Sequence, residues 1–221
     1  MDLKPSALSV EDRYKLLIGS IVPRPIAFVS TVAPAGTGLV GADAYNLAPF
    51  SFFAGVGSNP MTLLFCPANR PDGGEKDSLR NAKPVSEGGT GEFVVNIVPH
   101  AIARRMAACA EELVYGQSEF VLSGLTPIAS SVVKPPRVAE CPIAFECRTT
   151  QVIRTNPGQA SGGNIVIGEV VSIHADERIV NERMHVDAAA LDAIGRMGGR
   201  AYCTTRERFD IPWGRAALGG D

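Results

Sequence analysis

Proline and glycine recur along the whole chain and limit how far any helix can run. The 221 residues include 16 prolines and 23 glycines. Proline lacks a backbone N–H and breaks helices, and glycine favours turns. After an expected short helix over residues 11–20, Pro23 and Pro25 force the chain into an extended form. The sequence therefore predicts many short strands joined by turns, with few helices.

Apolar, β-prone runs follow one another at short intervals and are read as strands. We expect strands over residues 26–32, 50–56, 61–67, 91–99, 141–153 and 164–180, with the chain also extended from Leu39 onward. A turn over 33–38, a polar loop over 68–78 and a hairpin loop over 155–163 separate them. Along 141–153 the alternation predicts one face carrying Ile143, Phe145, Cys147, Thr149 and Gln151, and a second face carrying Ala144, Glu146, Arg148 and Thr150.

Helical periodicity is confined to a few segments. It predicts a brief helix ended by Pro84, a clear helix over 100–114, and a helix that starts at residue 187 and is stopped by Gly198 and Gly199. A doubly wound fold needs helices between successive strands, and the first hundred residues do not supply them. The fold class expected is mainly β: an antiparallel barrel, closed or partly closed, with a few flanking helices.

Charge, hydropathy and cysteine usage exclude several classes of protein. The net charge of −2 gives no reason to expect a nucleic-acid or anionic-membrane partner. No apolar run approaches the roughly 18 residues of a membrane span, and the N-terminus does not resemble a signal peptide. The five cysteines form no C-x-x-C pair, which favours reduced thiols in a cytoplasmic protein. The cysteines and the three scattered histidines also lack zinc spacing, so no metal site is predicted.

Gly36, Gly38 and Gly41 spell G-x-G-x-x-G directly after the first expected strand. This fingerprint binds a dinucleotide only where the third glycine opens a helix and an acidic residue lies about 20 residues further on. Here Pro49 and a β-prone aromatic run argue against a helix, and the segment NPMTLLFCP has no acid. The alternative, a hairpin turn in which glycines supply positive φ, is favoured.

An ordered set of motifs resembles the flavin reductase-like family of FMN-binding split barrels. The set runs through LLIGSIVPRPIAFVST (16–31), YNLAPFSFF (45–53), KDSLRN (76–81), SEFVLSGLTP (118–127), VKPPRVAECPIAFEC (133–147), GEVVSIH (168–174) and RMGGRAYCTT (196–205). The resemblance covers about residues 14–205. It implies a single flavin reductase-like domain over 1–221, with extensions at both ends of this core.

The resemblance implies an FMN site, and the local chemistry agrees with it. Arg24, Lys76 and Arg80, with the Ser78 hydroxyl, form a candidate donor set for a phosphate dianion. Polar or small residues suited to the ribityl chain, the ring edge or close backbone approach, and Phe52 beside the ring, complete the strand part of the site. The cofactor-binding residues expected are Arg24, Pro25, Ser30, Thr31, Ala44, Tyr45, Asn46, Leu47, Ala48, Ser51, Phe52, Lys76, Asp77, Ser78, Arg80, Arg196 and Tyr202. Arg196 and Tyr202 rest on the resemblance, and Lys76 has a competing role as an ion-pair partner of Asp72, Glu75 or Asp77.

The activity implied is an NAD(P)H-dependent flavin oxidoreductase. Hydride would pass from NADH or NADPH to FMN, and electrons then to free flavin, a small molecule or a protein. This transfer needs no acid or base, so no catalytic side chain is predicted, and His174 is more simply a structural residue. Two alternatives stay open: a flavin-binding electron carrier that does not react with nicotinamide, and a ligand-free barrel that serves as a partner-binding domain. The resemblance and the apolar strand set also imply a homodimer.

Overall fold

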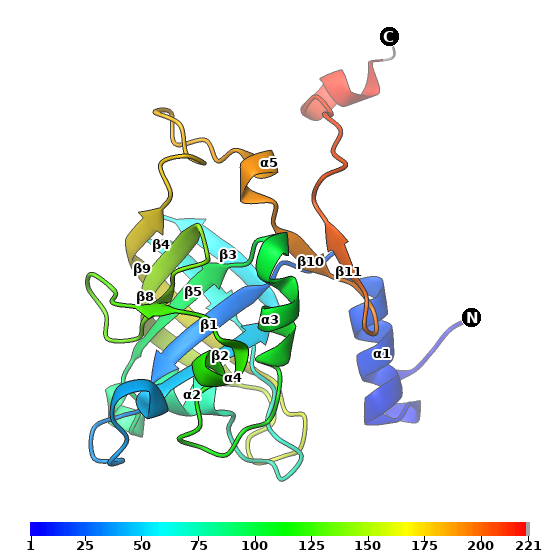
Figure 1. Ribbon diagram of the computed structural model, residues 1–221. Helices are drawn as coiled ribbons and strands as arrows, with labels where there is room; N and C mark the ends of the chain where they lie inside the picture. The colour runs from blue at the N-terminus through cyan, green and yellow to red at the C-terminus, as the bar shows by residue number, and fades with distance from the viewer. Residues whose placement is uncertain (220–221) are drawn as a thin grey trace.

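The computed structural model describes residues 1–219 as a β-rich body with two segments that project from it (Figure 1). The strands are β1 (Ala27–Val32), β2 (Tyr45–Phe50), β3 (Phe53–Ser58), β4 (Met61–Phe65), β5 (Glu92–Ile97), β6 (Pro127–Ile128), β7 (Arg137–Val138), β8 (Ile143–Arg154), β9 (Asn164–Ala175), β10 (Ile194–Arg196) and β11 (Tyr202–Thr204). The α-helices are α1 (Val10–Ser20), α2 (Asp77–Ala82), α3 (Ala103–Ala108), α4 (Glu119–Ser123) and α5 (Ala188–Leu191).

Seven strands form one antiparallel sheet in the order β2-β1-β5-β8-β9-β4-β3. β2 and β3 stand at the two ends of this order and do not pair, so the barrel is only partly closed. Its interior is apolar: the rings of Phe50 and Phe65 lie 5.2 Å apart and those of Phe65 and Phe93 5.1 Å apart. These contacts join β2, β4 and β5 across the interior. The predicted fold class is confirmed.

The G-x-G-x-x-G stretch lies in the connection between β1 and β2. The two strands pair from Ala27 opposite Phe50 to Val32 opposite Tyr45. All three glycines have positive φ, between 59° and 90°, which is the reason glycine stands there. A 3₁₀ turn, Gly41–Ala44, follows in place of the extended chain expected from Leu39, and the strand begins at Tyr45. The prediction of a hairpin rather than a dinucleotide-binding loop is confirmed.

β8 and β9 form the long hairpin that the sequence predicts, with two bulges. Phe145 and Cys147 face the barrel interior and Ala144 the opposite side, as expected. Thr149 pairs with Gly168 and Gln151 with Ile167, so Thr150 is an extra residue in β8. A bulge of one residue exchanges the faces beyond it. Val152, rather than Gln151, therefore shares a face with Phe145 and Cys147, so the predicted face of Gln151 is wrong.

Three expected elements end early. The helix predicted over 100–114 is a 3₁₀ turn followed by α3, which ends at Ala108. If the helix continued, the negative charges of Glu111 and Glu112 would lie near its C-terminus, where the helix dipole disfavours them. The helix from residue 187 stops at Asp192, whose φ of 44° is left-handed, and residues 194–196 form a strand instead. The strand predicted to residue 180 ends at Ala175, before a turn in which Asp176 accepts hydrogen bonds from Arg178.

A second apolar cluster lies outside the barrel, where α3 and α4 cover β1 and β2 (Figure 1). Phe28 and Leu47 point outward from the two strands and pack with Met106 of α3 and Phe120 of α4, and all four side chains are buried. This layer fixes the segment between α3 and α4 above the end of β2. It thereby builds one wall of the site described below.

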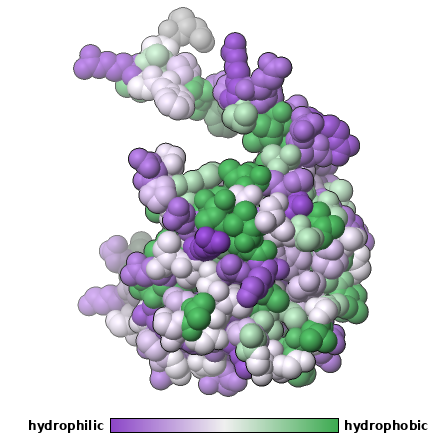
Figure 2. Space-filling view, turned by 90° about the vertical axis from the view of Figure 1, so that its left-hand side faces the viewer, coloured by the Kyte–Doolittle hydropathy of each residue, from purple (hydrophilic) through white to green (hydrophobic). Residues whose placement is uncertain are grey.

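α1 and the C-terminal segment after β11 project from the body. α1 has no buried residue, and the β10–β11 hairpin stands beside it (Figure 1). The C-terminal segment stands off the main body in the space-filling view (Figure 2), and its Phe209 and Trp213 are 83% and 94% exposed. Within residues 1–219, no helix combines the length and the apolar character that crossing a membrane requires.

Candidate functional site

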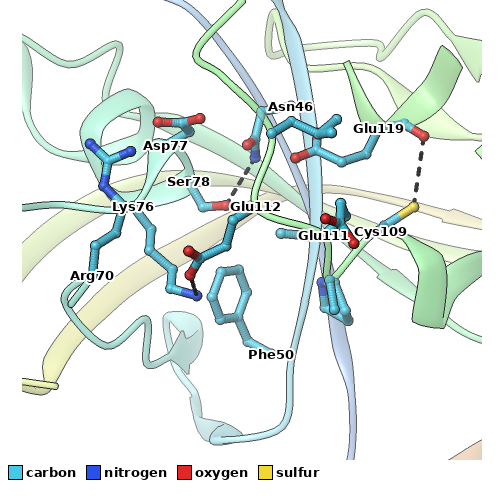
Figure 3. Close-up of a pocket in the computed structure, with 14 residues that line it drawn as sticks. Asn46, Phe50, Arg70, Lys76, Asp77, Ser78, Cys109, Glu111, Glu112 and Glu119 are labelled. Carbon is cyan, nitrogen blue, oxygen red and sulfur yellow. Dashed lines mark hydrogen bonds and ion pairs between the residues drawn. The ribbon is translucent and has the colours of Figure 1, made fainter. Parts of the chain in front are cut away.

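A pocket of about 110 Å³ opens between α2, the end of β2 and the segment that follows α3 (Figure 3). We call it the α2 pocket. It is lined by Asn46, Ala48, Pro49, Phe50, Arg70, Lys76, Asp77, Ser78, Cys109, Ala110, Glu111, Glu112, Leu113 and Glu119. β2 and α2 supply one wall, and residues 109–113 with Glu119 supply the other.

Buried polar contacts lock α2 against the first two strands. The Asn46 side-chain amide on β2 donates to the Ser78 hydroxyl on α2 over 2.9 Å, and both side chains are buried. One turn later, the Asn81 amide donates to the Thr31 hydroxyl on β1 over 3.0 Å. The Tyr115 hydroxyl donates to the Asn81 carbonyl oxygen over 3.0 Å. These bonds hold α2 against β1 and β2 at one wall of the pocket.

Charges of both signs meet in the α2 pocket. Lys76 Nζ lies 3.6 Å from the Glu112 carboxylate (Figure 3). The buried Nε of Arg70 and the buried Oδ1 of Asp77 have no hydrogen-bond partner among the residues the structure describes. Burial raises the pKa of Asp77 against the opposing pull of nearby cations, Arg70 first among them. Two side chains of the pocket thus carry unused hydrogen-bonding capacity, the feature expected where a polar ligand binds.

Glu119 and Cys109 are the buried titratable groups of the outer wall. Glu119 is 5% exposed, and its carboxylate accepts a hydrogen bond from the Leu47 N–H over 2.8 Å. This contact satisfies a backbone group on β2, the end strand of the sheet, between two residues that line the pocket. Burial raises the pKa of Glu119 to about 7 and that of the Cys109 thiol to about 11. Cys109 is therefore a neutral thiol near pH 7 and a poor nucleophile.

Replacing Glu119 by glutamine should change how stability depends on pH. Because the folded protein holds a proton on Glu119 up to about pH 7 and an ordinary glutamate loses it near pH 4.5, wild-type stability falls across this window. We expect the unfolding free energy of wild type, relative to Glu119→Gln, to decrease from pH 4.5 to 7 and to be level outside that range. Urea unfolding at pH 4–8 measures it, with Glu111→Gln as the control. A difference that does not vary with pH would contradict the assignment.

The structure brings part of the predicted site together at the α2 pocket and places the rest elsewhere. Asn46, Ala48, Lys76, Asp77 and Ser78 line the pocket. Ala44 and Tyr45 line a smaller recess next to it. Leu47 is buried in the outer apolar cluster. Ser30 and Thr31 are fully buried, with the Ser30 hydroxyl donating to the Pro136 carbonyl.

The three cations expected to share one phosphate lie in different environments. Arg24 is 3% exposed and donates to the Ser51 hydroxyl and to backbone carbonyls. The Arg80 guanidinium stacks on the Tyr115 ring, 3.8 Å from its centroid. Lys76 alone of the three lines the pocket, and it pairs with Glu112 rather than with Asp72, Glu75 or Asp77.

The remaining predicted residues gather at the base of α1. The Phe52 ring lies under the Arg24 guanidinium, at 5.8 Å, and Pro25 is exposed beside it. The Arg196 guanidinium lies 4.4 Å from the centroid of the Tyr202 ring and donates to the Gly199 carbonyl. The backbone of Arg196 pairs with that of Arg24.

Sequence reasoning missed Arg70, Pro49, Phe50 and the outer wall of the pocket. Arg70 lies in the polar loop before α2. Its position before Pro71 in a non-helical stretch could have marked it as a candidate phosphate ligand. Glu119 lies in the SEFVLSGLTP motif and residues 109–113 lie in the expected helix, but neither pattern marks them as pocket residues, because the wall exists only through the packing of α3 and α4 on β2. The described residues hold no cluster of three His, Cys, Asp or Glu side chains arranged to bind a metal ion.

Comparison with known proteins identifies a family match over most of the chain. The family model for the flavin reductase-like domain matches residues 18–192. A protein of Deinococcus radiodurans is 40% identical over 209 residues, which are 93% of this chain and 86% of the relative.

Solved structures share the fold. Nitrilotriacetate monooxygenase component B from Bacillus cereus is 33% identical with a TM-score of 0.84, and the match covers 96% of this chain and 98% of that one. The 2-nitrobenzoate 2-nitroreductase of Pseudomonas fluorescens is 29% identical with a TM-score of 0.79, and the match covers 97% and 96% of the two chains.

Proposed function

The chain belongs to the flavin reductase-like domain family, and from this premise we propose that it binds FMN with its phosphate end in the α2 pocket and oxidises NADH or NADPH. The observation that carries the proposal is the buried Nε of Arg70, which has no hydrogen-bond partner among the described residues and only a 3.9 Å ion pair with Asp72. The wider family assignment makes the protein a flavin-related oxidoreductase. FMN as the flavin and a reduced nicotinamide as the donor are our additions.

The residues of the α2 pocket fit the phosphate end of FMN. Arg70 and Lys76 supply cationic donors, and the hydroxyl of Ser78 lies on the same wall. No side chain caps the first turn of α2, so its N–H groups add further donors. A pocket of about 110 Å³ is below the roughly 300 Å³ of typical small-molecule sites, so it suits one end of a nucleotide rather than all of it. The ring would extend along β2 past Ala48, where a small side chain leaves the backbone open.

When bound, FMN supplies a ring that accepts a hydride from a reduced nicotinamide. The contribution of this chain is to bind and orient that ring. The amide of Asn46, fixed by Ser78, and the end strand β2, fixed by Glu119, hold the pocket edge in place. Hydride transfer to the ring needs no acid or base, so no side chain is assigned a proton transfer.

An absorbance spectrum of the purified protein with added FMN, followed by anaerobic addition of NADH or NADPH, tests the proposal. We expect bound flavin whose visible absorbance is lost within seconds to minutes after one of the two nicotinamides is added. The electron-carrier alternative predicts bound flavin that neither nicotinamide bleaches at a useful rate. A protein that binds no FMN would contradict both. The second electron acceptor would be free flavin, a small molecule or a protein.

Lys76→Ala should weaken FMN binding by about tenfold, because a charge-assisted contact to phosphate is lost. Titration of flavin fluorescence measures the dissociation constant. Lys83→Ala is the matched control, since Lys83 pairs with Glu75 away from the pocket. Unchanged FMN affinity in Lys76→Ala would remove Lys76 from the site.

We also propose that the protein is a homodimer. α1 exposes Tyr14, Leu16 and Leu17, and the C-terminal segment exposes Phe209 and Trp213. An 11-residue helix is marginal in water without packing, and a second copy of the chain would cover these large exposed apolar side chains. Light scattering coupled to size exclusion should give twice the mass of one chain. A monomer that still binds FMN would contradict the proposal.

A further inference from the structure

Glu112 supplies the carboxylate that pairs with Lys76 in the α2 pocket. Its carboxylate lies 3.6 Å from Lys76 Nζ (Figure 3), and both residues line the pocket. An anion bound at Lys76 would approach the same ammonium group, and two negative groups around one cation repel each other. Glu112 and the ligand anion therefore compete for the ammonium group when such a ligand enters.

The ion pair is placed so that it can break without moving the rest of the wall. The side chains of Lys76 and Glu112 are 38% and 61% exposed, so both charges can be taken up by water. Residues 109–117 form no helix or strand. Three residues beyond Glu112, Tyr115 is fixed independently by its hydrogen bond to Asn81 and by the stacked Arg80 guanidinium. Glu112 can thus swing away while Tyr115 keeps the segment against α2.

We propose that Glu112 is a specificity-determining residue of the flavin site: it competes with the ligand phosphate for Lys76 and so lowers the advantage of FMN over riboflavin. The inference rests on the proposed function. Its consequence is a flavin that exchanges more readily, because part of the phosphate binding energy is spent in displacing Glu112. If Glu112 only formed a surface ion pair with Lys76, away from the bound phosphate, it would not change the affinity for FMN relative to riboflavin.

Riboflavin separates these cases because it has the same ring and ribityl chain and lacks the phosphate. In Glu112→Gln we expect FMN to bind about two- to fivefold more tightly, the range that an exposed ion pair supports, with riboflavin affinity unchanged. Glu111→Gln is the matched control: it removes the same charge from the same wall, and no ion pair of Glu111 is present among the described residues. It should shift the ratio of the two affinities by a smaller factor.

The double variant Lys76→Ala/Glu112→Gln completes the test. If Glu112 acts through Lys76, the gain in FMN affinity seen in Glu112→Gln is absent from the Lys76→Ala background. FMN affinity that is unchanged or weaker in Glu112→Gln overturns the inference, as does an equal shift for FMN and riboflavin. Wild-type protein that binds neither flavin refutes the proposed function itself, and this inference with it.

Discussion

Glu146→Ala is expected to lower the free energy of unfolding by about 2–4 kcal/mol. Glu146 lies on β8, is 1% exposed, and accepts hydrogen bonds from the N–H groups of Ser131 and Val132 at 2.7 Å and of Val133 at 3.2 Å. Alanine leaves all three donors without their partner. An unsatisfied buried donor costs about 1–3 kcal/mol, and the exposed positions of Ser131 and Val132 allow water to recover part of it.

Urea unfolding measures the loss, and amide exchange locates it. Because Val133 packs with Val94 and Ala144 on the outer side of the sheet, exchange should accelerate at 131–133 more than in the barrel interior. Glu146→Gln retains one acceptor oxygen and should lose about half as much stability. A loss below about 0.5 kcal/mol for Glu146→Ala would show that the loop does not depend on this carboxylate.

Arg24→Ala is expected to cost a similar amount and to release α1. The guanidinium donates to the carbonyls of Ile18 and Ile21 at the end of α1, over 2.5 and 2.8 Å, and to that of Met197 over 3.0 Å. Its Nε donates to the Ser51 hydroxyl over 3.1 Å. These bonds satisfy orphan carbonyls of the helix and place a cation at its C-terminus. Since α1 buries no side chain in this chain, its attachment depends on them.

Faster cleavage by trypsin at Arg13 and Lys15 would show that α1 is released. Urea unfolding measures the total decrease in the free energy of unfolding, about 2–4 kcal/mol. Arg24→Lys should rescue little, because an ammonium cannot reproduce the planar fork of donors. Arg183→Ala, an exposed arginine outside α1, is the control, because it leaves both cleavage sites of α1 in place. If Arg24→Ala instead left stability intact and weakened FMN, the phosphate role expected from the sequence would be restored.

The hairpins were predictable from sequence because local chemistry dictates them. Glycines with positive φ set the β1–β2 turn, and alternation set the pairing of β8 with β9. The bulge at Thr150 was not predictable, since it depends on how the partner strand curves. The helix expected over 100–114 was predicted too long. Its apolar spacing continues to Leu113, whereas the helix ends at Ala108, before Glu111 and Glu112, whose charges are unfavourable at a helix C-terminus.

Sequence motifs predicted only those residues of the site that lie on β2 and at α2. Asn46, Lys76 and Ser78 were found by motif and lie together. Arg24 was expected to bind phosphate because a sequence does not reveal that four groups of the chain already accept its donors. Glu119 and Glu112 lie in segments that the sequence singles out, but their place at the pocket was not predicted, because tertiary packing rather than spacing brings them there.

The position of β9 has a consequence for synthesis of the chain. β9 pairs with β8 on one side and with β4 on the other, and Phe65 of β4 meets Val166 about 100 residues later in the chain. While the ribosome makes the intervening segment, the β3–β4 hairpin has one unpaired, apolar edge and no place in the sheet. The β3–β4 hairpin can join the sheet only once β9, among the last strands made, is available to link it to β8.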